Sequence, residues 1–119
     1  EVAVAAILDG SGAQAPRREG HVAPPRAAPG MVAVTVAGGI GDYRSGDEIW
    51  CDRLAPEAYA AALNRDVLVP RPAGRFLFGR LIGREDGKLH LLPLGAGARQ
   101  QVVSDPPWIA SAVRLVRTL

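Results

Sequence analysis

Apolar residues in this chain occur in short runs, and nearly every run ends at a cluster of Gly, Pro, Asp or Asn. Such runs, rich in valine, leucine and isoleucine, are typical of β-strands, since a helix of ordinary length needs a longer amphipathic pattern. The pattern predicts seven or eight short strands, at residues 2–8, 31–36, 48–52, 66–69, 75–84, 88–92, 100–103 and 109–116.

One segment departs from this pattern and predicts a helix. It runs from Pro56 to Leu63 (PEAYAAAL), with a proline where the first turn tolerates it and Glu57 near the positive end of the helix dipole. Elsewhere, Asp86-Gly87 separates two apolar runs, which is a strong hairpin signal. We therefore expect a mostly-β fold, a small barrel or paired sheets, with one short helix.

The length of 119 residues predicts one domain, covering 1–119. Within it, residues 1–30 form an N-terminal strand and a loop rich in Pro, Ala and Arg that crosses the surface, and residues 31–119 form the β core. Because the chain begins at Glu1 rather than Met, we interpret it as a fragment of a longer protein.

Composition narrows the classes of function. The 14 basic and 12 acidic residues are scattered, and lysine occurs once, at Lys88, so nucleic-acid binding by this domain alone is not expected. The single cysteine, Cys51, excludes an internal disulfide or a cysteine-based metal cluster and is compatible with a reducing cytoplasm. The longest apolar stretch, Val2 to Leu8, is too short to span a bilayer.

Two stretches of the core occur in a characteristic order. The first is a strand at Val32 to Gly38, a glycine turn at Gly39 to Asp42, and then Tyr43 to Trp50 (YRSGDEIW). The second is a strand from Asn64 to Val69, followed after a turn by Gly74 to Leu81 (GRFLFGRL). Together they resemble the peptidase-like C-terminal domain of LexA, UmuD and related phage repressors, and the resemblance covers about residues 31–117. It implies a β-ribbon fold of the LexA and signal-peptidase type.

The resemblance also implies that the peptidase chemistry is lost. In that family a strand enters a Gly-Asp-Ser-Met-x-Pro turn with the nucleophile, and a later Val-Lys-Arg-Leu carries the general-base lysine. Here the turn is about two residues shorter, with Gly39 in place of a serine, and Gly79 stands at the lysine position. A serine is a poor nucleophile without its base, and removing either member costs several orders of magnitude in rate.

No other group predicts catalysis or a cofactor. Ser45 precedes Gly46-Asp47, where a polar turn residue is expected, and Lys88 opens a strand and is expected to be exposed. The glycines at 38–41 lack the lysine and hydroxyl residue of a phosphate loop. The remaining reactive side chains have no partner evident from sequence and are interpreted as structural: Ser11, Ser104, His21, His90 and Cys51. Neither a metal nor a cofactor is expected.

What remains of the family's role is assembly. We expect a catalytically inactive LexA-like domain that joins two subunits of a cytoplasmic transcription regulator, each binding DNA through an N-terminal helix-turn-helix domain outside this chain. The resemblance places the interface on the last strand, at Trp108, Ile109, Val113 and Leu115. Two alternatives stay open: an effector, anti-repressor or peptide module that uses the former substrate cleft, widened by Gly39 and Gly79, and an active autopeptidase.

Overall fold

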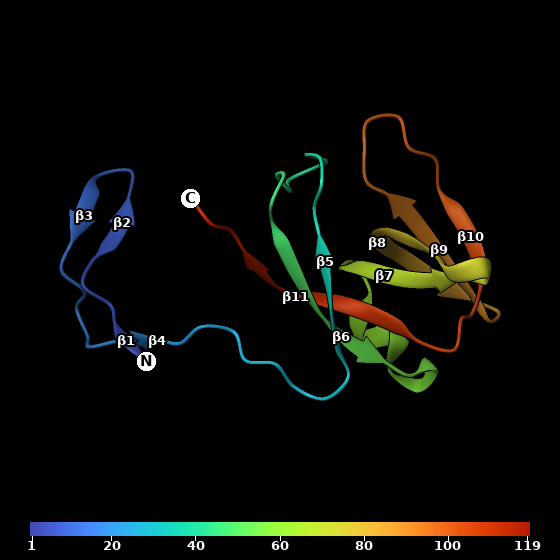
Figure 1. Ribbon diagram of the computed structural model, residues 1–119, viewed down its shortest axis with the longest axis horizontal. Helices are drawn as coiled ribbons and strands as arrows, with labels where there is room; N and C mark the ends of the chain where they lie inside the picture. Colours follow the sequence, from blue (N-terminus) through green and yellow to red (C-terminus); the bar gives the residue numbers. More distant parts are fainter.

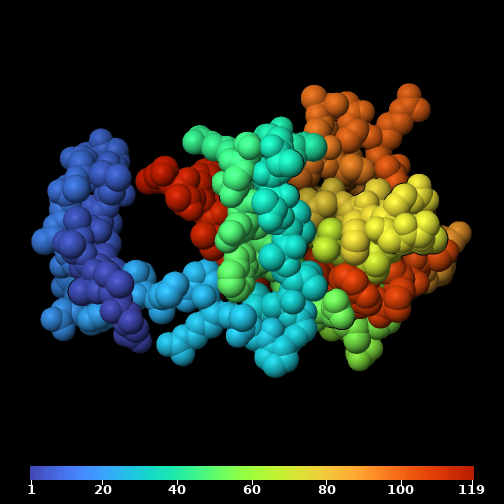
Figure 2. All heavy atoms as spheres, in the orientation of Figure 1, coloured from blue at the N-terminus to red at the C-terminus, as the bar shows by residue number.

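The computed structural model describes all 119 residues, with 50% of them in strands and 8% in helices, so the predicted mostly-β class is confirmed. It consists of a β body, residues 31–119, and an N-terminal arm, residues 1–22, connected by a linker, residues 23–30. The arm lies beside the body as a separate lobe (Figures 1 and 2).

The arm contains four very short strands where one strand and a loop were expected. β1 (Val2–Ala3) pairs with β4 (His21–Val22), and β2 (Ile7–Asp9) pairs with β3 (Gly12–Gln14). The prediction of one strand over 2–8 and an unpaired 13–30 loop was therefore wrong. The arm folds back on itself because Asp9 accepts hydrogen bonds from the backbone N–H and the hydroxyl of Ser11, which closes a tight turn.

The body is one bent antiparallel sheet of seven strands, in the order β10-β9-β8-β7-β11-β6-β5. Its two edges, β5 and β10, do not pair, so the sheet is open rather than a closed barrel. The strands agree with the predicted ranges to within two residues at each end: β5 (Met31–Thr35), β6 (Glu48–Leu54), β7 (Asp66–Arg71), β8 (Arg75–Glu85), β9 (Lys88–Pro93), β10 (Gln101–Ser104) and β11 (Ile109–Val116).

Tight turns fix the registers of the hairpins. Between β8 and β9, Asp86 (φ 51°) and Gly87 (φ 71°) both have positive φ, which confirms the hairpin predicted from Asp-Gly. Between β7 and β8, the three-residue turn η2 (Pro72–Gly74) places Ala73 and Gly74 in the same left-handed region.

The last strand, β11, lies in the middle of the sheet rather than at its end. It pairs with β6 from Ile109↔Leu54 to Val116↔Glu48. On its other side it pairs with β7 only at Ala110 and Ser111. Its C-terminal half, residues 112–116, therefore has a neighbouring strand on one side only.

The predicted helix forms at η1 (Pro56–Ala62) but is a 3-10 helix rather than an α-helix. No side chain caps its N-terminus, and seven residues are too few for an α-helix to be stable alone. It buries Tyr59 and Ala62 against the sheet, so packing rather than propensity holds it. Neither of the two short helical segments has the length or apolar character to cross a membrane.

The core divides into two clusters on opposite faces of the sheet. The larger lies under η1 and contains Tyr59, Ala62, Val67, Val69, Leu81, Leu89, Leu91, Val103 and Ile109. The smaller is built on Val36, Ile49, Cys51 and Ala110, with half-buried apolar side chains around it. The strict alternation of β9, in which Leu89 and Leu91 are buried and His90 is half-buried, follows from the two-residue period of a strand.

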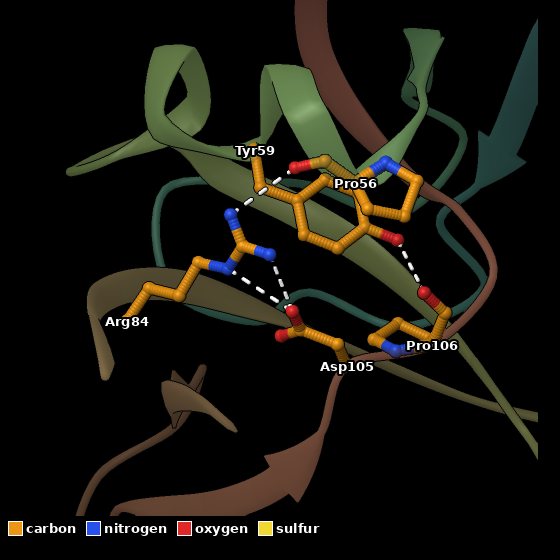
Figure 3. A network of polar contacts seen from close by, with 5 residues as sticks. All are labelled: Pro56, Tyr59, Arg84, Asp105 and Pro106. Carbon is orange, nitrogen blue, oxygen red and sulfur yellow. Dashed lines mark hydrogen bonds and ion pairs between the residues drawn. The ribbon is translucent and has the colours of Figure 1, made fainter. Parts of the chain in front are cut away.

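A polar network closes the end of the larger cluster (Figure 3). The Tyr59 hydroxyl donates to the backbone carbonyl of Pro106 at 2.5 Å. The Arg84 guanidinium contacts the Asp105 carboxylate, donates to the Pro56 carbonyl at 3.1 Å, and lies 5.0 Å from the centre of the Tyr59 ring. These contacts connect η1, β8 and the segment between β10 and β11.

Gly79 in the middle of β8 allows a close approach between strands. A Cβ atom placed there would lie 2.5 Å from the carbonyl oxygen of Leu92 and 2.7 Å from the Cα of Pro93, both backbone atoms of β9. We expect Gly79→Ala to lower the free energy of unfolding by about 2 to 3 kcal/mol, since β9 must shift to make room.

The matched control is Gly83→Ala in the same strand, where a Cβ would meet only His90 side-chain atoms at 3.8 Å or more. We expect Gly83→Ala to change stability by less than about 1 kcal/mol. Urea denaturation followed by circular dichroism measures both values. Equal effects of the two substitutions would contradict the explanation by close approach.

Candidate functional site

The glycine turn at residues 39–42, predicted to be the former nucleophile turn, lies shortly after the end of β5. Ile40 and Tyr43 exchange backbone hydrogen bonds of 3.0 Å and so close residues 40–43 into a tight loop. Gly39 is exposed, and a Cβ there would lie 3.6 Å from the Tyr43 carbonyl oxygen, an ordinary contact. A side chain would therefore fit at position 39, and a serine there would have room.

Gly79, at the position of the lysine in the resemblance, is in a different situation. It is buried in β8, paired with Val67 on one side and Pro93 on the other. The backbone of β9 occupies the space that a side chain would need. The expectation that Gly79 widens a cleft was therefore wrong, because the neighbouring strand fills that volume.

An apolar hollow of about 260 Å³ nevertheless lies between the turn and β8. Val34 of β5, Val36 just after it and Phe78 of β8 form much of its wall, and Ile40 and Leu94 also line it. Few polar groups line it, so it is suited to binding an apolar group and offers little for chemistry.

A second apolar hollow, of about 510 Å³, adjoins the first on the same face and shares Val34 and Phe78 with it. Trp108 lies in its wall, with the Phe76 ring centre 6.4 Å away and the Arg53 guanidinium stacked 4.2 Å from the indole centre. Phe76 is 53% exposed. No element of the chain covers this face of the sheet.

Polar groups flank the first hollow on the side of β7 and β8. The Tyr43 hydroxyl donates to the Asp66 carboxylate, and Arg80 Nε lies 3.7 Å from the other Asp66 oxygen. Burial, and then the hydrogen bond to Asp66, raise the pKa of the Tyr43 hydroxyl above its ordinary value. Tyr43 thus stays protonated at neutral pH and holds the turn against β7.

The side chains considered for catalysis do not converge on the turn. The Ser45 hydroxyl donates to the Ala37 carbonyl at 2.9 Å, which is a turn contact, as expected. Lys88 is exposed and lies directly opposite exposed Ser104 on β10, a cross-strand neighbour that the sequence did not reveal. Activation of a serine by lysine needs a base shielded from water, and this pair is in solvent.

The histidines and the cysteine also lie apart. His21 is exposed in the arm, and His90 Nδ1 lies 2.8 Å from the Gln100 amide nitrogen. Cys51 is buried in β6, and burial raises the pKa of its thiol to about 11, so it is not a reactive thiolate at neutral pH. No three His, Cys, Asp or Glu side chains gather as a set of metal ligands.

The four residues expected at a subunit interface differ in exposure. Ile109 is completely buried in the larger core cluster and has no surface to offer a second chain. Trp108 is half-buried in the second hollow. Val113 is half-buried and Leu115 is 46% exposed, both on the half of β11 whose outer edge is unpaired.

Asp47, expected from sequence to be a turn residue, also forms an ion pair with Arg117. Its side chain is completely buried and accepts hydrogen bonds from the Arg44 backbone N–H at 2.8 Å and from Arg117 Nε and Nη2 at 2.8 and 2.7 Å. Sequence reasoning missed this pair because its members lie 70 residues apart.

Comparison with known proteins adds no relative: no protein-family description, no curated protein and no solved structure matches this chain.

The Asp47–Arg117 pair predicts a specific dependence of stability on pH. The hydrogen bonds from Arg117, and then from Arg44, lower the pKa of Asp47 from 3.8 to about 2. A carboxyl with a depressed pKa in the folded state stabilises it above the unfolded value and loses that contribution as pH falls toward the folded value. We therefore expect the urea midpoint to decrease between about pH 4 and pH 2.

The Asp47→Asn variant should be less stable at neutral pH and show a smaller decrease over the same interval, measured by urea titration at each pH. Asp86→Asn is the matched control, because Asp86 is exposed in the β8–β9 turn and has no charged partner. It should follow the native curve. Identical pH profiles for the native chain and Asp47→Asn would contradict the assignment.

Proposed function

We propose that this chain is a homodimerisation domain of the LexA and phage-repressor type that has lost its peptidase activity. In the intact protein it would hold together two helix-turn-helix domains in the cytoplasm, so that both half-sites of an operator are bound at high effective concentration. The sequence resemblance suggests the class of regulator, and the exposed edge of β11 suggests how the domain would pair.

The single observation that carries the proposal is the half-paired state of β11. Residues 112–116 pair with β6 on one side and with nothing on the other, and they carry the partly exposed apolar side chains of Val113, Leu115 and Val116. A strand edge with unpaired N–H and C=O groups is a template for another strand. In a symmetric dimer two copies of this edge would meet antiparallel and join the two sheets.

The surroundings of this edge also favour pairing with a second copy of the chain. A hollow of about 520 Å³ lies over the sheet face next to this half of β11, bounded by Val113 and Arg114 on β11, by Asp52 on β6, and by Pro24 and Pro25 of the linker. In Figure 2 an open space separates the arm, the linker and the C-terminal end of β11. The open space leaves the C-terminal end of β11 accessible to a second chain.

The proposed loss of peptidase activity rests on Gly39 and Gly79 and on the exposure of the one lysine, Lys88. The turn offers no hydroxyl, and β9 excludes a side chain at 79. Incubating the full-length protein at alkaline pH, or with activated recombinase, should give no specific self-cleavage.

Oligomeric state tests the dimer directly. Sedimentation velocity at micromolar concentration should show a dimer of the native chain, and Leu115→Glu should shift it to monomer, because a buried charge at the strand edge costs more than the apolar contact gains. Leu92→Glu on β9 is the matched control: Leu92 is 41% exposed, compared with 46% for Leu115, but lies on a strand paired on both sides.

We expect Leu92→Glu to remain dimeric. A native chain that sediments as a monomer at every concentration, together with a monomeric full-length protein, would overturn the proposal. Dissociation by both glutamate variants would instead point to a general loss of stability.

The first hollow supports a second candidate, capture of an extended apolar peptide such as a segment of an anti-repressor. β5 is an edge strand whose outer backbone groups are unpaired, and Val34 on it and Val36 just after it line the hollow. An added strand could therefore hydrogen-bond to β5 while an apolar side chain enters the hollow. Titration with acetyl-Ala-Val-Leu-amide should shift the methyl NMR signals of Val34 and Ile40 but not that of Val102 on β10. Unchanged signals would exclude this candidate.

A further inference from the structure

The ion pair between buried Asp47 and half-buried Arg117 lies where the free half of β11 ends. Arg117 is the first residue after β11, and its guanidinium donates one hydrogen bond to each oxygen of the Asp47 carboxylate. It also donates to the Asp42 carbonyl at 3.4 Å. Two-point contacts of this kind fix direction as well as distance, which a lysine cannot do.

The carboxylate itself is held rigidly. Asp47 is completely buried, its backbone N–H donates to the Arg44 carbonyl at 3.0 Å, and its carbonyl accepts from Val36 at 2.9 Å. Gly46 donates to the Val36 carbonyl at 2.7 Å, so the turn is bound to the end of β5. Arg117 is thus anchored to the part of the fold that follows β5, far from its own position in the sequence.

The strand that this anchor follows is otherwise weakly held. From residue 112 onward β11 has hydrogen bonds to β6 alone, and its register with β6 is interrupted between Ala112 and Arg114. A segment paired on one side near a chain end opens locally at low cost. If this edge becomes ordered only when a second chain binds, the conformational entropy that it loses makes the binding free energy less favourable.

We propose that the Asp47–Arg117 pair is a clamp that holds the free edge of β11 in the conformation that a second copy pairs with. This inference rests on the dimer proposed above. Both residues are positioning residues: they act by ordering Val113 to Val116 in the monomer, before a second chain arrives, and removing the clamp weakens the dimer without removing an interface contact.

Arg117→Met tests the clamp, since methionine retains much of the apolar stem but neither hydrogen bond. The matched control is Arg99→Met, because Arg99 is exposed in the β9–β10 connection and has no carboxylate partner. Sedimentation equilibrium should show a dimer dissociation constant about tenfold or more above the native value for Arg117→Met, and a native value for Arg99→Met.

A second measurement separates the clamp from the interface. In the Leu115→Glu background, where no second chain protects the edge, amide hydrogen exchange of residues 113–116 should be about tenfold faster with Arg117→Met, while the Leu89 and Leu91 amides keep their rates. The double variant Asp47→Asn/Arg117→Gln leaves no unpaired buried charge. It should recover part of the dimer affinity, which a collapse of the fold would not allow.

The outcomes are distinct. A native dimer whose dissociation constant is unchanged by Arg117→Met, or an edge whose exchange is unchanged, overturns the clamp and leaves the dimer standing. A native chain that is monomeric at all concentrations overturns both proposals. Faster exchange at residues 113–116 together with a weakened dimer supports the clamp.

Discussion

The antiparallel ladder between β11 and β6 is the interaction on which the rest of the fold depends. Without β11, the β5–β6 pair would have no strand pairing with the β7–β10 meander, because β11 alone lies between them in the sheet. Adjacent residues of this strand serve both cores, with Ile109 in the larger cluster and Ala110 in the smaller. The sheet can therefore be completed only after the last strand has been inserted, and such non-local pairing is slow to form.

The same position of β11 explains why the outer side of its residues 112–116 remains unpaired. β11 is longer than its contact with β7, and no other strand of the structure pairs with the outer side of residues 112–116. A closed barrel would have removed such edges. The open sheet instead leaves the edge strands β5 and β10, and half of β11, with unpaired backbone groups. These are positions at which natural proteins either place charges or accept another strand.

Local signals in the sequence predicted most of the body, and non-local contacts account for what they missed. Asp86-Gly87 identified its hairpin because the turn chemistry is contained in two residues. By contrast, nothing near Arg117 reveals that it meets Asp47, and nothing near Ile109 distinguishes a central strand from an edge strand. In the arm, the pattern over 2–8 predicted one strand. The arm strands do not join the seven-stranded sheet, and Ile7 to Asp9 instead pairs across a local turn with Gly12 to Gln14.

The two glycines that the proposed resemblance places at the dyad positions, Gly39 and Gly79, differ in the space around them. At Gly39 the surroundings leave space for a side chain, so a hydroxyl could be placed there with little disturbance. At Gly79 the backbone of β9 lies within 2.7 Å of where a Cβ would be, so a lysine would require the β8–β9 pairing to open at Leu92 and Pro93. One replacement in the turn would therefore place a hydroxyl there without a base beside it. A lysine at position 79 would cost part of the sheet that buries Leu91, because the close packing of these strands leaves no room for its side chain.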